Sequence, residues 1–417
     1  SSYEQSIYKS HFRKMTIVYL HQYFKTPKDS GGTRSYEMAR RFVKAGHRVI
    51  MITSDMVADE AGGWYRSDVE GIEIHWLPVS YNNKMSYGDR IKAFFKFALK
   101  AGKKAASFDA DVIFATSTPL TIAIPAIHAK KKLKVPMVFE VRDLWPELPI
   151  AMGAIKNPIL KYAAKKLERY AYKHSEHVVA LSPGMKEGVV KTGYPEKNVT
   201  VIPNSCDMEL FTVNDEEGKV FRNQYEWLQH RPLIVYTGTL GHINGVGYLA
   251  EVAKEMKSIN PEVRFVVIGD GVEFEKIRAL AQKKEVFEQN FFMLGKMTKE
   301  EIPSVLNAAD IATSLFIDLE PMWANSANKF FDALASGTPV AINYGGWQKK
   351  ELESSEAGIL LSPKDYKKAA LKMNDLLNDA EKLHQMGQKA KTLSIEKFDR
   401  DKLAQELLNV LEKAANV

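Results

Sequence analysis

Two oppositely charged residues, Lys329 and Asp332, stand three positions apart in the stretch "NSANKFFDALASGTPV". Asn325 and Ser326 at its start are good N-cap residues and a glycine near its end is a common stop signal, so we predict a helix over 327–336. The apolar side chains of this helix share one face, which leaves the two charges together on the other. They form either a solvated surface pair worth about 0.2–0.5 kcal/mol, or part of a ligand site, since a glycine loop follows at the end where open α/β sheets bind their ligands.

Glycine-rich stretches follow apolar runs at several further places in the chain. They are "GGT" with Gly31 and Gly32, "TGTLGHINGVG" with Thr239 and Asn244, "GDG" with Gly271, and "LGKM" with Lys296. A backbone without side chains can approach a phosphate closely, and the N-terminus of a following helix favours its negative charge. Each stretch is a weak signal alone, but their repetition at equivalent places predicts a nucleotide-containing substrate.

A second group of charged residues lies in "FEVRDLWPELP", where Arg142, Asp143 and Glu147 follow an apolar run. The segment is either a packed loop corner or a place where charged groups face a substrate, since such groups are costly to bury without partners. The chain also contains His21 and His128, which could take part in proton transfer, although an isolated histidine is more often structural.

The elements that must position these residues alternate along the chain. Strands followed by helices, repeated in this way, predict a parallel sheet covered by helices on both faces. We expect strands at 15–20, 47–53, 72–79, 111–116, 136–141 and 177–182, and again at 232–238, 263–269, 290–295, 311–316, 339–343 and 358–362. The fold class is therefore α/β, with two Rossmann-like, doubly wound domains facing across a cleft.

Length and composition agree with two soluble domains. The 417 residues are 45% hydrophobic and 26% charged, and the single cysteine, Cys206, excludes a disulfide framework and fits a reducing cytoplasm. We place the first domain at 15–205, the second at 206–395, and at 396–417 a helix that could cross back to the first domain. Residues 1–14 look like an added tail before a natural start at Met15.

The net charge of +7 favours an anionic partner. Two basic amphipathic helices, predicted at 90–108 and 161–173, suit an anionic membrane surface, with Lys96, Lys100 and Lys103 facing the lipid. Each could equally pack its apolar side on the sheet and leave its lysines in water. No zinc-finger spacing or aromatic RNP-like strand supports nucleic acid as a partner.

Taken together, these motifs resemble glycosyltransferase family 4, which contains retaining enzymes of the GT-B fold, and within it the bacterial N-acetylfucosaminyltransferase-like branch of O-antigen and capsule synthesis. The resemblance runs from Met15 to the C-terminus. Its marks are "FEVRDLWPELP", "VIPNSCDMELF", "YTGTLGHINGVGYL", "VIGDGVEFEKIRALA" and "NSANKFFDALASGTPV". It implies that the first domain binds the acceptor and the second binds the nucleotide sugar.

This chain departs from the family pattern at four positions. An Arg and a Lys that usually grip the donor diphosphate correspond to Thr239 and Asn244, and the first of two glutamates corresponds to Ala324. Asp332 stands in place of the second glutamate, which implies that it holds ribose hydroxyls. Lys329 is then our prediction for the replacement cation, with Arg142 and His242 as weaker candidates. The predicted donor-binding residues are Gly31, Gly32, Thr239, Asn244, Gly271, Lys296, Asn328, Lys329 and Asp332.

The function that the resemblance implies is retaining transfer of a sugar from a nucleotide sugar, expected to be UDP-linked, to a lipid-linked saccharide on the cytoplasmic face of the membrane. Neither a metal nor another cofactor is expected, and the leaving phosphate oxygen can take the acceptor proton. The predicted catalytic residues are Arg142, Asp143, Glu147 and Lys329. The alternatives are a nucleotide-sugar 2-epimerase of the same fold and a non-catalytic nucleotide-sugar-binding scaffold. A dinucleotide dehydrogenase fits less well, because "GGT" lacks the G-x-G-x-x-G spacing.

Overall fold

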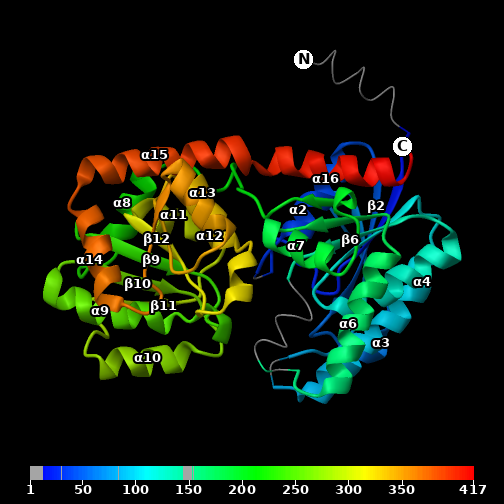
Figure 1. Ribbon diagram of the computed structural model, residues 1–417, viewed down its shortest axis with the longest axis horizontal. Helices are drawn as coiled ribbons and strands as arrows, with labels where there is room; N and C mark the ends of the chain where they lie inside the picture. The colour runs from blue at the N-terminus through cyan, green and yellow to red at the C-terminus, as the bar shows by residue number, and fades with distance from the viewer. Residues whose placement is uncertain (1–12, 30, 83, 144–152, 154) are drawn as a thin grey trace, which may run out of the picture. The chain divides into compact units, whose positions relative to one another are not determined.

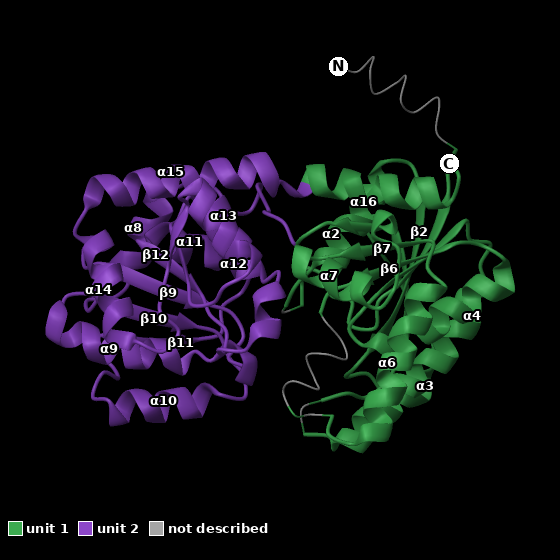
Figure 2. Cartoon of the chain, in the orientation of Figure 1, with its two compact units in different colours: residues 1–203, 401–417 green, residues 204–400 purple. Residues whose placement is uncertain are grey.

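The computed structural model describes residues 13–29, 31–82, 84–143, 153 and 155–417. The chain forms two compact units (Figures 1 and 2). Unit 1 consists of residues 1–203 and 401–417, and unit 2 consists of residues 204–400. The chain therefore passes between the units twice, once near residue 203 and once near residue 400.

Unit 1 is built on an eight-stranded sheet in the order β3-β4-β2-β1-β5-β6-β7-β8. All neighbouring strands run parallel except β3 and β4, which are antiparallel. The central strands are buried on both faces, as is expected of a sheet covered by helices. The strands are β1 (Thr16–Leu20), β2 (Arg48–Asp55), β3 (Tyr65–Val69), β4 (Ile72–Pro78), β5 (Val112–Thr116), β6 (Met137–Val141), β7 (His177–Ala180) and β8 (Val199–Val201).

The helices of unit 1 connect and cover this sheet (Figure 1). They are α2 (Arg34–Lys44), α3 (Tyr87–Ala105), α4 (Ala123–Leu133), α6 (Pro158–Lys173), α7 (Pro183–Lys191) and the last helix, α16 (Arg400–Ala414). Helices α3, α4 and α6 lie side by side, with α4 contacting both of the others. Leu403, Leu407 and Leu411 of α16 belong to the same apolar core as strands β1 and β2. The C-terminal helix is thus part of the first domain.

Unit 2 contains a six-stranded, fully parallel sheet in the order β11-β10-β9-β12-β13-β14. Its strands are β9 (Leu233–Thr237), β10 (Arg264–Ile268), β11 (Phe291–Gly295), β12 (Ile311–Ser314), β13 (Val340–Ile342) and β14 (Gly358–Leu360). Its helices are α8 (Asp215–Asn223), α9 (Gly247–Ile259), α10 (Phe274–Lys283), α11 (Ile302–Ala308), α12 (Asn328–Ala335), α13 (Trp347–Ser355), α14 (Tyr366–Leu377) and α15 (Ala380–Lys397). Because every strand is parallel, all carboxyl ends meet at one edge of the sheet, where ligands of such folds bind.

The prediction of two doubly wound α/β domains is confirmed, and each predicted strand is present within a few residues. The sequence reading missed two strands, β3 and β8. Strand β3 lies at the sheet edge and is largely exposed, so it lacks an apolar pattern, and β8 has only three residues. Within the described ranges, no helix is long and apolar enough to cross a bilayer.

Candidate functional site

Helix α12 begins at the carboxyl edge of the unit 2 sheet, with Asn328 and Lys329 in its first turn. The predicted helix is present, but its N-cap is Ala327, and neither predicted capping residue fills that position. Asn325 accepts a hydrogen bond from the backbone of Ala327, while the Ser326 hydroxyl accepts one from the backbone of Asn204. The Phe330 N–H bonds the carbonyl oxygen of Ala327 at 3.2 Å, whereas the N–H groups of Asn328 and Lys329 have no partner within the helix, so this end of α12 can receive an anion.

The Lys329 ammonium lies between two aromatic rings at this edge. Its Nζ is 5.3 Å from the ring centroid of Tyr236 on β9 and 5.2 Å from that of Phe316, which follows β12. Burial lowers the pKa of Lys329 to about 8, an effect that outweighs the opposing attraction of Asp332. A cation that is partly desolvated in this way gains more from an incoming anion than a fully hydrated lysine does.

The loops after β9 and β10 meet backbone to backbone beside Lys329. A Cβ atom at Gly238 would lie 2.9 Å from Cε of Lys329, and one at Gly269 would lie 1.8 Å from the carbonyl oxygen of Gly238. Both glycines have positive φ, +149° and +147°, which L side chains rarely adopt. Glycine is therefore required at both positions, and the result is an exposed stretch of backbone directly next to the ammonium group.

The other predicted donor-binding residues of unit 2 occupy the same edge in different ways. Thr239 and Lys296 are exposed on the loops after β9 and β11, where their side chains can reach a ligand. Gly271 is partly buried, and a Cβ atom there would lie 2.6 Å from the carbonyl oxygen of Leu240. Asn244 is buried, and its Oδ1 accepts a hydrogen bond from the backbone of Gly241 at 3.1 Å. Its geometry thus assigns Asn244 to loop stabilisation rather than to ligand contact.

Asp332 lies one turn after Lys329 on the same side of α12, and its side chain is partly buried. Burial raises the pKa of its carboxyl group to about 7, although Lys299 and Arg400 oppose the shift. Lys299 precedes α11 and Arg400 begins α16, so the carboxylate is within electrostatic range of both cations. A carboxylate there can accept hydrogen bonds from sugar hydroxyl groups.

At the carboxyl edge of unit 1, a buried ion pair joins α2 to β6. Glu140 is fully buried and receives Nε and Nη2 of Arg34 at 3.3 and 3.1 Å, while Thr116 donates to it at 2.9 Å. Arg34 also donates to the carbonyl oxygens of Ile202 and Pro203. The positive charges of Arg34 and its neighbour Arg142 hold the pKa of Glu140 below its usual value despite the cost of burial. Sequence reading missed this pair because its partners stand 106 positions apart.

Arg142, predicted as a catalytic residue, is partly buried and tied to this network. Its Nε donates to the Thr116 hydroxyl at 2.7 Å, its Nη2 bonds the Ser35 hydroxyl, and its Nε lies 3.4 Å from Glu140. Because these contacts hold the guanidinium group in place, Arg142 is suited to fixing the loops at the carboxyl edge of the unit 1 sheet. Asp143, the next residue, is exposed and accepts a hydrogen bond from Thr118 at 2.9 Å. Glu147 lies outside the described residues.

The remaining predicted residues of unit 1 are found on its surface or core. Gly31 and Gly32 are exposed directly before α2, and Gly31 has a φ of +109°. His21 is buried just after β1, where burial and the nearby Arg142 lower its pKa well below the usual value, so it is neutral. Lys96, Lys100 and Lys103 of α3 are all exposed, and Lys96 pairs with Glu60.

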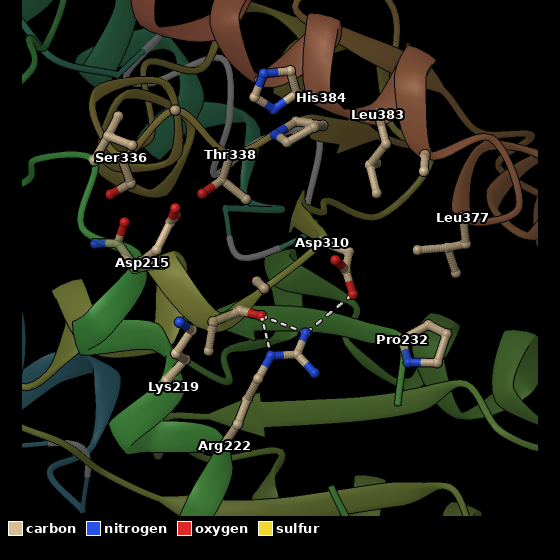
Figure 3. Close-up of a pocket in the computed structure, with 18 of the residues that line it drawn as sticks. Asp215, Lys219, Arg222, Pro232, Asp310, Ser336, Thr338, Leu377, Leu383 and His384 are labelled. Atoms are coloured by element: carbon tan, nitrogen blue, oxygen red, sulfur yellow. Dashed lines mark hydrogen bonds and ion pairs between the residues drawn. The ribbon is translucent and has the colours of Figure 1, made fainter. Parts of the chain in front are cut away.

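A cavity of about 1240 Å³ in unit 2 lies at the opposite edge of the sheet, next to the amino ends of β9, β12 and β13 (Figure 3). Its most prominent cation, Arg222, donates to the carbonyl oxygen of Ala308 at 3.0 and 2.6 Å and pairs with Asp310 at 3.1 Å. Asp310 in turn accepts from the backbone of Leu233. Since other groups of the protein already bind Arg222 and Asp310, this cavity is a poorer binding site for an anion than the start of α12.

Comparisons with known proteins assign families to both units. Residues 31–205 match the family described as Glycosyl transferase 4-like domain, and residues 219–393 match Glycosyl transferases group 1. An uncharacterized glycosyltransferase of Methanocaldococcus jannaschii is 22% identical over 63% of this chain, and the lipopolysaccharide 1,2-N-acetylglucosaminetransferase of Salmonella typhimurium is 22% identical over 51%. The chain covers 64% and 55% of these relatives, which is less than two thirds of each.

The fold comparison points the same way. The crystal structure of HepE from Anabaena in complex with UDP superposes with a TM-score of 0.73 at 17% identity, covering 96% of this chain and 100% of that one. The two matched domains follow each other in the order of the two units, and each unit has the Rossmann-like architecture of a GT-B domain. The chain therefore belongs to the glycosyltransferases, with a family 4-like domain followed by a group 1 domain.

Proposed function

We propose that this protein is a retaining, metal-independent glycosyltransferase that moves a sugar from a UDP-linked donor to a lipid-linked saccharide in cell-surface polysaccharide synthesis. The observation that carries the proposal is Lys329, a partly desolvated cation in the first turn of α12 beside the exposed backbone of Gly238. The UDP bound to HepE and the lipopolysaccharide named for the Salmonella relative support the choice of donor and acceptor.

The donor diphosphate is assigned to the start of α12. A leaving nucleoside diphosphate carries about two negative charges, which cations, backbone N–H groups and a helix dipole can stabilise. Lys329 supplies the cation that the family pattern places at Thr239 and Asn244, neither of which is charged. Asp332, one turn further along α12, accepts the ribose hydroxyl groups.

The transfer itself needs little from an acid–base residue. As the bond between the sugar and the phosphate breaks, the departing phosphate oxygen can accept the proton of the attacking hydroxyl group on the same face, which retains the anomeric configuration. Lys329 stabilises the charge that develops on that phosphate. In unit 1, Asp143 and Glu147 are proposed to orient the acceptor, and the network of Arg142 with Glu140 keeps this edge rigid.

The acceptor would be reached at an anionic membrane, to which α3 and α6 bind. Several large apolar side chains on these two helices point into solvent: Leu99, Ile159 and Tyr162 are 71%, 76% and 68% exposed. Tyr87, Phe95, Leu160 and Tyr170 on the same helices are also exposed. Helices that lie in the interface of a bilayer typically combine exposed apolar side chains with neighbouring lysines. If both helices packed their whole apolar sides on the sheet, these groups would be buried instead.

Basic residues surround those apolar side chains. Lys92, Lys100 and Lys103 on α3 and Lys165, Lys166, Arg169 and Lys173 on α6 are exposed. Each basic residue near an anionic surface contributes about 1 kcal/mol to binding. The combination supports an anionic bilayer as the partner of this surface and a peripheral position on the cytoplasmic face of the membrane.

Transfer is tested with purified full-length protein, a panel of UDP-sugars and a membrane extract that supplies lipid acceptors. We expect UDP release that depends on the extract and a lipid product with the anomeric configuration of the donor. Isomerisation at C2 of the donor without an acceptor would instead identify an epimerase. Donor binding without turnover under any acceptor would identify a binding scaffold, and an inverted product would refute the retaining mechanism.

Membrane binding is tested by sedimentation with vesicles of phosphatidylglycerol and phosphatidylcholine in equal amounts. We expect the double variant Lys100→Glu and Lys103→Glu to bind at least about tenfold more weakly than wild type, and the difference to shrink at high salt. The double variant Lys349→Glu and Lys350→Glu on α13 serves as the control for total charge. Equal weakening in both variants, or none in the first, would contradict the assignment to α3.

A further inference from the structure

Trp323 is exposed at the carboxyl edge of unit 2, five residues before the start of α12. It belongs to a short 3₁₀ helix (Glu320–Ala324) between β12 and α12, and 37% of its surface is accessible. Large aromatic side chains usually bury most of their surface, so a tryptophan presented to solvent beside a ligand-binding edge calls for an explanation.

One side of the Trp323 ring rests on the turn that follows β13. A Cβ atom at Gly345 would lie 3.4 Å from three indole atoms, Cδ2, Cε2 and Cε3. At Gly346, where φ is +95°, a Cβ atom would lie 2.6 Å from the carbonyl oxygen of Trp323 and 2.8 Å from its Cβ. The two glycines therefore let the backbone contact the ring on one side. The accessible surface of the side chain then belongs to the remainder of the ring.

The segment that carries the ring is held rigidly. The backbone N–H and Nδ2 of Asn325 both bond the carbonyl oxygen of Met322, at 3.1 and 2.8 Å. Trp347 Nε1 and Gln348 Nε2 donate to the carbonyl oxygen of Asn325 at 2.9 and 3.1 Å. A side chain placed on so constrained a backbone loses little entropy when a ligand packs on it, as a preorganised binding surface requires.

Aromatic contacts connect this turn to the cation of the site. Phe316, whose ring lies 5.2 Å from Lys329 Nζ, packs edge-on against Tyr344 with centroids 5.4 Å apart. Tyr344 directly precedes Gly345, on which the Trp323 ring rests. Trp323 thus precedes the start of α12 on the side of the β13 turn, whereas Asp332 lies one turn further along the helix.

We propose that Trp323 is the surface on which the donor sugar ring stacks, and that it determines which sugar is accepted. This inference rests on the proposed function, because a diphosphate held at Lys329 with its ribose at Asp332 directs its sugar away from Asp332, toward the residues that precede α12. Ala324, where the family pattern has an acid that could bind sugar hydroxyls, is apolar and only 8% exposed. An aromatic face binds a sugar through its C–H groups, which favours a deoxy or acetamido sugar. A carboxylate would instead favour a sugar that it can bind through hydroxyl groups.

The test compares binding of UDP with binding of UDP-glucose, UDP-galactose, UDP-N-acetylglucosamine and UDP-N-acetylgalactosamine by isothermal titration calorimetry on the full chain. We expect wild type to bind at least one UDP-sugar more tightly than UDP. Trp323→Ala should raise the Kd of that UDP-sugar by about ten- to a hundredfold, the loss expected when the sugar no longer covers an aromatic face. It should leave the Kd of UDP within about twofold of wild type. Trp323→Phe, which keeps an aromatic face, should recover most of the affinity.

Leu371→Ala is the matched control, since Leu371 is a large apolar side chain, 42% exposed, on α14 of the same unit. Equal loss for UDP and the UDP-sugar in Trp323→Ala would show that the tryptophan only supports the edge and would overturn the inference. Equal affinity of wild type for UDP and all four UDP-sugars would overturn it too. Failure of wild type to bind UDP at all would instead refute the proposed function.

Discussion

Replacing Lys329 by methionine removes the cation of the site and keeps most of its apolar stem. The ammonium lies 5.3 and 5.2 Å from two ring centroids, next to the backbone of Gly238, so an unbranched side chain of similar length can keep the packing. The predicted loss is that of the charge. A preorganised donor to a developing anion is worth about 2.7–4 kcal/mol, or about a hundred- to a thousandfold in kcat.

Lys329→Arg tests whether the size of the cation matters as well as its charge. The charge is restored, but a Cβ atom at Gly238 would already lie 2.9 Å from Cε of Lys329, which shows how closely the side chain fits against this loop. The larger guanidinium group cannot occupy the same position, so we expect kcat to recover only in part. Lys350→Met, on the exposed face of α13 in the same unit, controls for the loss of one positive charge.

The assay measures UDP release with saturating donor and acceptor, together with the Kd of UDP for each variant. We expect kcat of Lys329→Met to fall by the amount given above while its melting temperature stays within a few degrees of wild type. Turnover within about threefold of wild type would refute the assignment of the cation. A fall of the same size in Lys350→Met would show that total charge, and not this position, is what matters.

Three further predictions follow from the same groups. The pKa of Lys329 is lowered to about 8 and that of Asp332 is raised to about 7, so both groups are charged mainly between pH 7 and 8, where UDP affinity should be highest. Titration calorimetry on wild type and Lys329→Arg checks this. If UDP affinity fell above pH 8 in the arginine variant as it does in wild type, the result would count against Lys329. The raised pKa of Asp332 means that the protonated acid favours the folded state and that this contribution is lost as pH rises through about 7. The loss builds up from the ordinary pKa of 3.8 to about pH 7, so Asp332→Asn should gain melting temperature relative to wild type and gain more at pH 8 than at pH 5; equal differences at both values would contradict it. Glu140→Gln leaves the buried Arg34 without its counter-charge and should lower the free energy of unfolding by about 3–5 kcal/mol. Urea denaturation measures this loss, with the exposed Glu187→Gln as the control. A loss below about 1 kcal/mol would mean that the pair is not essential to unit 1.

The parts of the fold that depend on local pattern could be predicted from the sequence. The alternation of apolar runs and amphipathic stretches located both sheets, because parallel strands buried on two faces are continuously apolar. The same reasoning located α12 to within one residue at each end. It was wrong about the N-cap of α12, because Ser326 bonds Asn204, which stands 122 positions away, and a local pattern cannot show such a partner.

The site shows the same division between local and distant information. Lys329 was selected by its position in a short helix, which is readable from the chain, and by uncharged residues at two positions where the family pattern has cations, which the resemblance supplied. Its contact with Gly238 and the two rings is not, since those groups come from the ends of two different strands, β9 and β12. The loop-stabilising role of Asn244 and the exposed surface of Trp323 likewise depend on how loops fold against each other.

The central claim is that the start of α12 holds a nucleoside diphosphate through Lys329, and a crystal structure of the full-length protein with UDP tests it most directly. We predict that a phosphate oxygen lies within hydrogen-bond distance of Lys329 Nζ and of the first-turn N–H groups of α12, with the ribose at Asp332. A diphosphate bound elsewhere, for example in the cavity beside Arg222 at the opposite edge of the sheet (Figure 3), would contradict it.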